Sequence, residues 1–112
     1  MITFKKVKVC FILIFVFLNI FYIAPSYSLP LREDLFKSAL DLSSSGKFKL
    51  ALQEWNHYLD SYPDDAAGLS NRGNVRLVLG DLEGSIDDQN KAISLNPSEI
   101  DPYINRGIAE EA

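Results

Sequence analysis

Residues that support catalysis or metal binding are scarce in this chain. Its 112 residues include one histidine, His57, and one cysteine, Cys10. Cys10 lies in an apolar N-terminal run, so the rest of the chain has no thiol and forms no disulfide. No nucleophile with a base and no glycine-rich phosphate loop stands near His57, which is typical of a surface residue. The sequence therefore predicts no metal site, no cofactor and no enzymatic activity.

Clustered positive charge is also lacking after residue 28. Three of the 11 basic residues are Lys5, Lys6 and Lys8, so residues 29–112 hold 8 basic and 15 acidic residues, a net charge of −7. Proteins that bind nucleic acid neutralise phosphates with clustered lysine and arginine. We therefore expect no nucleic-acid partner.

The N-terminal segment, residues 1–28, has the three-part plan of a secretory signal. Three lysines precede an apolar run, Val9 to Ala24, that only Asn19 interrupts, and small residues follow at Ser26 and Ser28. Cleavage after Ser28 is the favoured interpretation. The alternative is an uncleaved anchor or membrane tether through residues 7–24, because 18 residues lie near the lower limit of roughly 17 to 25 for a spanning helix. Both interpretations predict an exported or membrane-anchored protein.

The remainder of the chain matches itself at a shift of 34 residues. The shift places Pro63 on Pro97 and Gly46 on Gly80, and it places residues 71–73 on 105–107, both Asn-Arg-Gly. Matches at three separate phases of one period indicate a repeat protein.

In these features the chain resembles the tetratricopeptide-repeat (TPR) family, whose unit is a 34-residue helix-turn-helix. On the family plan, residues 32–65 form a first repeat, 66–99 a second, and 100–112 the first helix of a third. The family places small residues at positions 8 and 20, glycine at the turn and proline at position 32. The matching residues are Ala39, Gly73 and Gly107 at position 8, Ala51 and Ser85 at 20, Gly46 and Gly80 at 15, and Pro63 and Pro97 at 32. The resemblance implies an all-α fold, a TPR solenoid of two full repeats plus one helix, preceded by the apolar signal or anchor helix.

The residue types have physical reasons of their own. Small residues let two helices approach closely, a glycine ends the first helix in a left-handed conformation, and a proline stops the second. Asp81 and the Asp101-Pro102 pair predict capped helix starts. In the second repeat, an apolar face is predicted from the helical spacing of Leu82, Ile86, Ile93 and Leu95.

The chain also departs from the family pattern. Position 7, usually leucine, is Ser38, Arg72 and Arg106, and position 11, usually tyrosine, is Leu42, Arg76 and Glu110. The run 63–74 is similar to exported TPR proteins of cyanobacteria and plastids, for which the compartment would be the periplasm or the thylakoid lumen.

The resemblance implies a peptide-binding groove on the concave face, lined by positions 2, 5, 6, 9, 12 and 13 of each first helix. From these positions the predicted binding residues are Lys37, Asn71, Asn74 and Asn105. An amide both donates and accepts hydrogen bonds, which suits the backbone of an extended peptide. The alternative is that these asparagines only solvate a helix face.

One TPR activity is not expected. Chaperone-type TPR domains hold a C-terminal carboxylate with lysine, asparagine and arginine at positions 2 and 6, and of these only Asn71 is present. Glu33 and Asp101 stand where lysines belong, and their negative charge repels a carboxylate.

Two functions follow for the repeat segment. The first is a non-catalytic interaction module that scaffolds a protein or peptide on its concave face, which includes a non-catalytic subunit of a larger complex. The second is a structural or assembly fragment that is completed by another chain or by self-association through its C-terminal end, where nothing later in the sequence covers Ile104 and Ile108.

The export prediction is tested by the N-terminus of the protein in its native cell. Because Ser28 ends the proposed cleavage site, N-terminal sequencing of the exported form is expected to begin at Leu29. Recovery of the chain from the cytoplasm as a soluble protein with residues 1–28 intact would contradict export.

Overall fold

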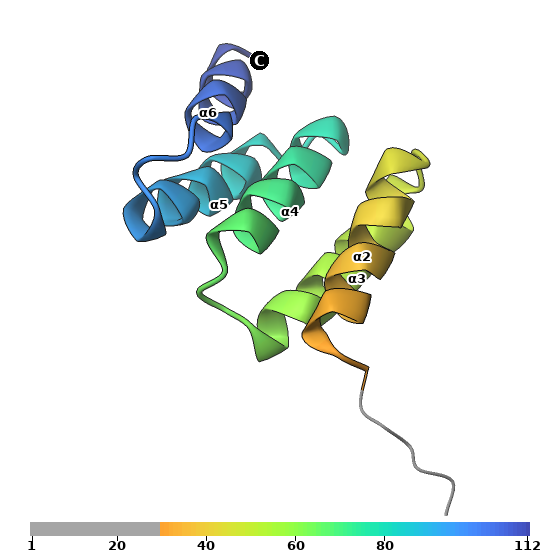
Figure 1. The fold of residues 1–112 in the computed structure, drawn as a ribbon. Coiled ribbons are helices and arrows are strands. Elements are labelled where there is room, and N and C mark those ends of the chain that lie inside the picture. The colour runs from red at the N-terminus through yellow and green to blue at the C-terminus, as the bar shows by residue number, and fades with distance from the viewer. Residues whose placement is uncertain (1–29) are drawn as a thin grey trace, which may run out of the picture.

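The computed structural model describes residues 30–112, which form five helices (Figure 1). They are α2 (Arg32–Ser44), α3 (Phe48–Ser61), α4 (Ala66–Val78), α5 (Leu82–Leu95) and α6 (Asp101–Glu111). The expected all-α architecture is therefore confirmed for this part of the chain. The predicted signal or anchor, residues 1–28, lies outside the described residues. Among residues 30–112 no helix combines the length and the apolar character that crossing a membrane requires.

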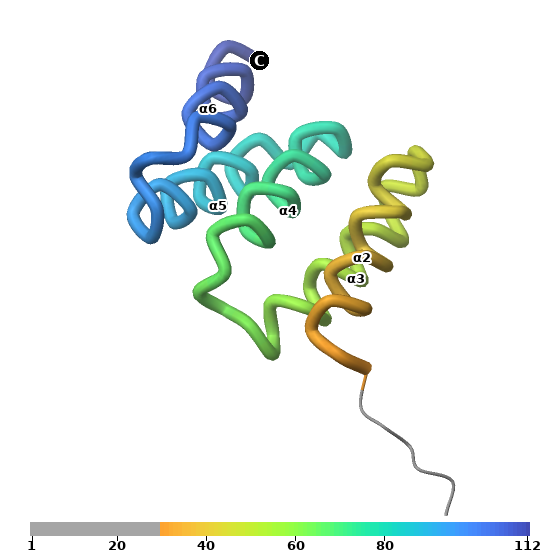
Figure 2. Tube along the Cα trace, in the orientation of Figure 1, coloured from red at the N-terminus to blue at the C-terminus, as the bar shows by residue number. Residues whose placement is uncertain are grey.

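The helices stack in chain order, as the trace in Figure 2 shows. Each helix packs against the next, and in addition α4 contacts both α2 and α6. Consequently α2, α4 and α6 form one layer, and α3 and α5 form the other. The helix pairs α2–α3 and α4–α5 start 34 residues apart, at Arg32 and Ala66.

Equivalent glycines make the turn inside each pair. Gly46 and Gly80 have φ of 73° and 86°. The backbone N–H of Lys47 donates to the Leu42 carbonyl, and that of Asp81 donates to the Arg76 carbonyl, so the last carbonyls of α2 and α4 are satisfied in the same way.

The helix starts differ from the expected ones at α6. Asp81 caps α5 as predicted, and its carboxylate accepts from the Gly84 N–H at 3.0 Å. Asp101 does not cap α6, so that prediction is wrong. The Ile100 carbonyl accepts bonds from the N–H groups two and three residues after Asp101, which draws Asp101 into the first turn. Its charge there still complements the helix dipole.

An aromatic core joins α2 to α3. Trp55 and Tyr58 are almost fully buried, and Phe36 meets both rings edge-on at centroid distances of 5.0 and 5.4 Å. The Trp55 indole N–H donates to the Ser43 hydroxyl at 3.0 Å, so the largest buried side chain has its polar atom satisfied.

The core between α4 and α5 is polar, contrary to the predicted apolar face. The residues of α5 buried in it are Ser85, Asp88, Gln89 and Ala92, whereas Leu95 is 41% exposed and the expected Leu82, Ile86 and Ile93 are only half-buried. The reason is a close approach at Gly73. A Cβ there would lie 2.6 Å from Gln89 Nε2 and 3.1 Å from Asp88 Cβ, so unbranched polar side chains fill the space that remains.

Asp65 ties three helices together where the two pairs meet. One carboxylate oxygen accepts from the Ala67 N–H at 3.1 Å and so caps α4. The other accepts from Arg32 of α2 at 2.9 Å and from the Tyr58 hydroxyl of α3. Burial acts to raise the pKa of Asp65, but the hydrogen bonds from Tyr58 and Arg32 outweigh it, and the pKa lies below its ordinary value of 3.8.

The first prediction from the fold concerns Gly73, with Gly107 as its matched control. Gly73→Ala is expected to destabilise the chain by roughly 1 to 3 kcal/mol, because the added methyl overpacks the α4–α5 crossing. A Cβ at Gly107 meets nothing within 4 Å, so Gly107→Ala is expected to stabilise α6 by about 0.5 to 1 kcal/mol. Urea unfolding followed by circular dichroism measures both. Equal effects of the two changes would contradict the close approach.

The second concerns pH. Because the pKa of Asp65 is lowered on folding, its stabilisation is present above its unfolded-state pKa of about 4 and is lost as pH falls through the lower folded-state value. Asp65→Asn is expected to reduce the free energy of unfolding at neutral pH by about 1.5 to 3 kcal/mol, with the difference from wild type shrinking below about pH 4.

Asp64→Asn is the control for this experiment. Asp64 is the exposed neighbour and pairs with Lys91 at 3.5 Å, so its change is expected to cost less than about 1 kcal/mol. Thermal melts of both variants between pH 3 and 7 make the comparison. A constant gap between Asp65→Asn and wild type over that range would rule out the linkage.

Candidate functional site

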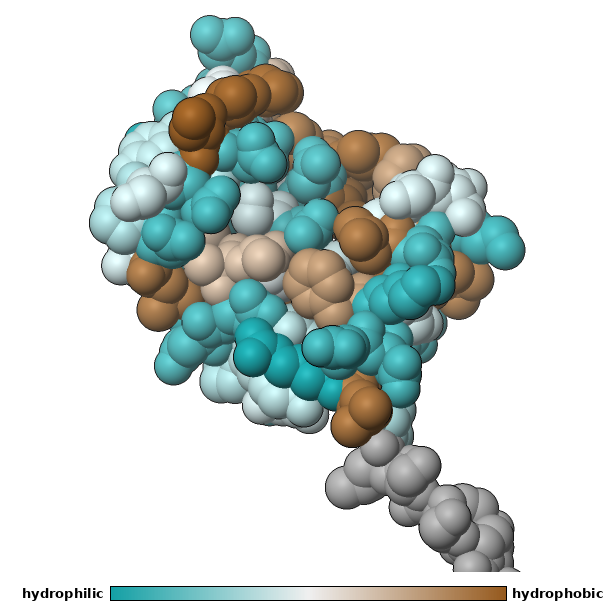
Figure 3. All heavy atoms as spheres, in the orientation of Figure 1, coloured by the Kyte–Doolittle hydropathy of each residue, from teal (hydrophilic) through white to brown (hydrophobic). Residues whose placement is uncertain are grey.

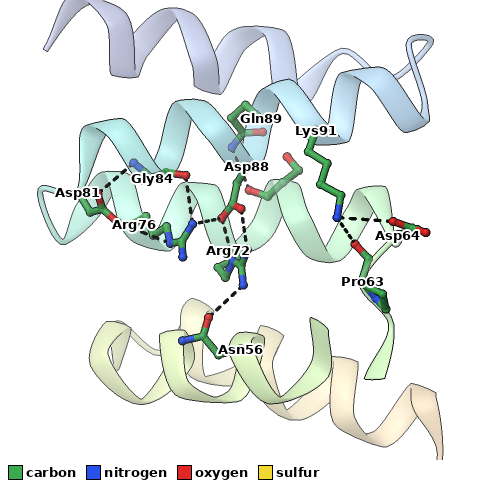
Figure 4. A network of polar contacts seen from close by, with 11 residues as sticks. Asn56, Pro63, Asp64, Arg72, Arg76, Asp81, Gly84, Asp88, Gln89 and Lys91 are labelled. Carbon is green, nitrogen blue, oxygen red and sulfur yellow. Dashed lines mark hydrogen bonds and ion pairs between the residues drawn. The ribbon is translucent and has the colours of Figure 1, made fainter. Parts of the chain in front are cut away.

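A polar network holds α4 against α5 (Figure 4). The Asp88 carboxylate, with 5% of its side chain exposed, accepts from Arg72 at 2.7 and 2.9 Å and from Arg76 at 3.0 Å. Arg76 also donates to the Gly84 carbonyl at 3.3 Å. A carboxylate shared by two guanidinium groups in this geometry is a strong, charge-assisted contact. Since both carboxylate oxygens are already bonded, the network is structural, and it fixes α4 for the surface on its other side.

That surface holds a hollow of about 530 Å³ between α4 and α6. Its lining consists of small, amide and acidic residues: Asp65, Ala66, Ala67, Ser70, Asn71, Asn74, Asn96, Glu99, Asp101, Pro102 and Asn105. No lysine or arginine is among them. The hollow therefore combines hydrogen-bonding amides with negative charge, although Arg32 neutralises part of the charge on Asp65.

Two smaller hollows adjoin it along α2. One, of about 230 Å³, shares Asn71 and Asn74 and extends to Leu40, Ser43 and Ser44. The other, of about 360 Å³, shares Asp65 and is lined by Arg32, Glu33, Phe36 and Tyr58. The exposed side of the α2, α4 and α6 layer is thus a continuous, irregular groove.

Three of the four predicted binding residues come together in the main hollow. Asn71 and Asn74 are contributed by α4, and Asn105 by α6. Asn71 donates to the Ala67 carbonyl at 2.9 Å, and within residues 30–112 the amides of Asn74 and Asn105 make no hydrogen bond. Two of the three amides are therefore free for a ligand, and the binding role of all three stays a prediction.

Lys37 is not part of this arrangement. It lines none of the three hollows and donates to Asp41, one turn along α2, at 2.9 Å. The hydrogen bond from Lys37 to Asp41 raises the pKa of Lys37. The ammonium is engaged on an exposed helix face, and no group in the described structure directs it toward the groove.

Metal binding finds no support in the described part of the chain. Residues 30–112 contain no group of three or more histidine, cysteine, aspartate or glutamate side chains that are placed to hold a metal ion. His57 is exposed on α3, as the sequence suggested.

Sequence reasoning missed the buried ion network and the hub at Asp65. Arg72 was read only as a departure from the family pattern, and Asp88 as part of a solvated surface. A signal was present in the spacing: Arg72 follows Asn56 by 16 residues, as Arg106 follows Asn90, and Arg72 precedes Asp88 by 16. In the structure all three pairs are bonded, at 3.1, 2.9 and 2.7 Å.

Comparisons with known proteins agree with this architecture. No protein-family model matches the chain. The tetratricopeptide repeat protein 36 of Danio rerio is 33% identical over 64 residues, which cover 57% of this chain and 34% of that protein. A protein SGT1 homolog of Bos taurus is 30% identical over 76 residues, which cover 68% of this chain and 22% of that protein. The chain thus spans about a third or less of the length of these relatives.

A solved structure has a similar fold. It is described as the first TPR of Spaghetti (RPAP3) bound to the HSP90 peptide SRMEEVD, and it matches with a TM-score of 0.68 and 22% identity over 75% of this chain and 70% of that one. At this identity the likeness shows the fold. Residues 30–112 therefore have a TPR-like, all-helical fold, as the 34-residue repeat predicted.

Proposed function

We propose that this chain is a non-catalytic interaction module that holds an extended peptide segment in the groove formed by α2, α4 and α6. In this proposal α2–α3 and α4–α5 are two TPR units, residues 32–65 and 66–99, and α6 is the first helix of a third. The observation that carries the proposal is the hollow in which Asn71, Asn74 and Asn105 converge from two helices.

The geometry of the hollow suits a peptide backbone. An extended peptide presents a carbonyl and an N–H at every residue, and an amide side chain can pair with either. The floor between the asparagines is made by Ala67 and Ser70, whose small side chains leave room for main chain. The TPR of similar fold holds a peptide, which supports the same use here.

The charge of the hollow argues for neutral or basic peptides. Glu99 and Asp101 are exposed at its rim, and no basic side chain lines it. A ligand with a free C-terminal carboxylate or several acidic side chains is repelled, whereas a lysine or arginine is attracted. The peptide that accompanies the RPAP3 structure, SRMEEVD, has the unfavourable character.

We also propose that residues 1–28 deliver the module across a membrane, as a cleaved signal or an uncleaved anchor. The support is the order of lysines, apolar run and small residues in that segment. The groove would then meet peptides of the periplasm, the thylakoid lumen or another exported compartment.

The main prediction is that peptides are selected through the three asparagines. Screening of the full chain against an arrayed library of random heptapeptides is expected to yield binders that fail to bind the triple variant Asn71→Ala, Asn74→Ala, Asn105→Ala. The loss for each single change is expected to be about 0.5 to 1.5 kcal/mol, the net value of one hydrogen bond. Gln53→Ala, which removes an exposed amide from α3, is the matched control and is expected to bind as wild type does.

The charge preference is measured with two defined peptides in the same assay. One is SRMEEVD with a free carboxylate, and the other has lysine in place of its three acidic residues and an amidated end. Isothermal titration is expected to show binding of the basic peptide about tenfold tighter or more, weakening as salt is added. Tighter binding of SRMEEVD would overturn the charge argument, and library binders that are indifferent to the triple variant would overturn the groove itself.

A further inference from the structure

The free side of α6 is a second surface of this molecule, separate from the peptide groove. The 34-residue repeat shows which residues belong to it. Arg72 donates to Asn56 at 3.1 Å across the α3–α4 contact, and Arg106 donates to Asn90 at 2.9 Å across the α5–α6 contact. Thus α6 sits on α5 as α4 sits on α3, and residues that face α5 from α4 have counterparts on α6.

On α4, the side that faces α5 is closed. Ser70, Arg72, Gly73 and Arg76 all contact Asp88 or Gln89 of α5. Their counterparts on α6, which we call the α6 face, are Ile104, Arg106, Gly107 and Glu110. The α6 face is open: Ile104 is 54% exposed, and a Cβ on Gly107 would meet nothing within 4 Å. In Figure 3 hydrophobic residues form a ridge over α6, where Ile108 is also half exposed.

The charges on the α6 face decide what can cover it. A helix of the α5 kind offers one buried carboxylate, which α4 neutralises with Arg72 and Arg76. On α6 the counterpart of Arg76 is Glu110, which would repel that carboxylate. A suitable occupant must instead present an acid to Arg106 and a base to Glu110.

A second copy of α6 meets this requirement. If two α6 helices pack antiparallel about Ile108, Arg106 of each copy lies opposite Glu110 of the other, because both positions are two residues from the centre. Within one chain the pair is loose, at 3.8 Å, and 33% and 58% of the two side chains are exposed, so both groups are available. Gly107 removes the side chain that would hold the helices apart, and the exposed isoleucines supply apolar area.

We propose that the chain forms a twofold symmetric dimer through the α6 face, with reciprocal Arg106–Glu110 ion pairs between the copies. Such an interface is self-complementary, as twofold symmetry demands. An 11-residue helix is about 16 Å long and buries less than a standard interface, so the dimer is weak and depends on concentration.

The test uses the full chain in a mild, density-matched detergent, which keeps the apolar N-terminal run equally solubilised in every variant. Sedimentation equilibrium between about 1 µM and 1 mM is expected to show a monomer–dimer equilibrium for wild type. Arg106→Glu and Glu110→Arg are each expected to weaken it at least about tenfold, since like charges then face each other across the axis. An equimolar mixture of the two variants is expected to associate again, because one copy now presents two acids and the other two bases.

Glu83→Arg is the control for net charge, since it makes the same reversal at an exposed site on α5. It is expected to leave the equilibrium unchanged, and circular dichroism checks that each variant keeps its helices. A chain that stays monomeric up to about 1 mM would overturn the proposal. Association that is equal in all variants would also overturn it, because the contact would then lie elsewhere, and so would a mixture that fails to recover.

Discussion

The close approach of α4 and α5 at Gly73 is the constraint on which the rest of the structure depends. It leaves no room for branched apolar side chains in the middle of the pair, and Asp88 and Gln89 occupy that space instead. A buried carboxylate is tolerable only when it is paired, and Arg72 and Arg76 pair with it from the adjacent helix. The orientation of α4 is set by these contacts, and with it the direction in which Asn71 and Asn74 face the groove.

The two helix pairs show that one backbone plan accepts two different cores. At equivalent positions 34 residues apart, the first pair has Trp55 and the second has Gln89, both fully buried. The first pair relies on aromatic area and edge-on ring contacts, and the second on ions and hydrogen bonds. The second arrangement is imperfect, because the Ser85 hydroxyl and the Gln89 carbonyl oxygen are buried without a partner in the described structure. Each such group costs about 1 to 3 kcal/mol, so the Asp88 network must outweigh them.

Much of the fold was predictable because the features that set it are local or periodic. The glycines with positive φ, the cap at Asp81 and the all-helical pattern all follow from residue type and spacing. The polar core was not predictable from hydrophobic spacing, since Leu82 and Leu95 suggested a different buried face. The cap at α6 was misplaced because helix ends depend on which carbonyl the next turn bonds, a detail that residue type does not decide.

The candidate site was predictable in part for the same reason. Asn71, Asn74 and Asn105 recur on one face of two equivalent helices, so their convergence follows from the repeat. Lys37 satisfies the same pattern, yet it lies outside the groove because Asp41, one turn away, holds its ammonium. The role of Asp65 depends on contacts with residues 33 and 7 positions away on two other helices, and no short-range pattern reports them.

The central claim is that the groove amides contact a bound peptide, and their own nuclear magnetic resonance signals test it most directly. The chain contains natural controls, since Asn56 and Asn90 are already bonded to Arg72 and Arg106 away from the groove. During titration with a library-selected peptide, the account predicts shifts of the side-chain amide signals of Asn74 and Asn105, with those of Asn56 and Asn90 unchanged. Unmoved groove amides at a saturating peptide concentration, or shifts confined to the two controls, would contradict it.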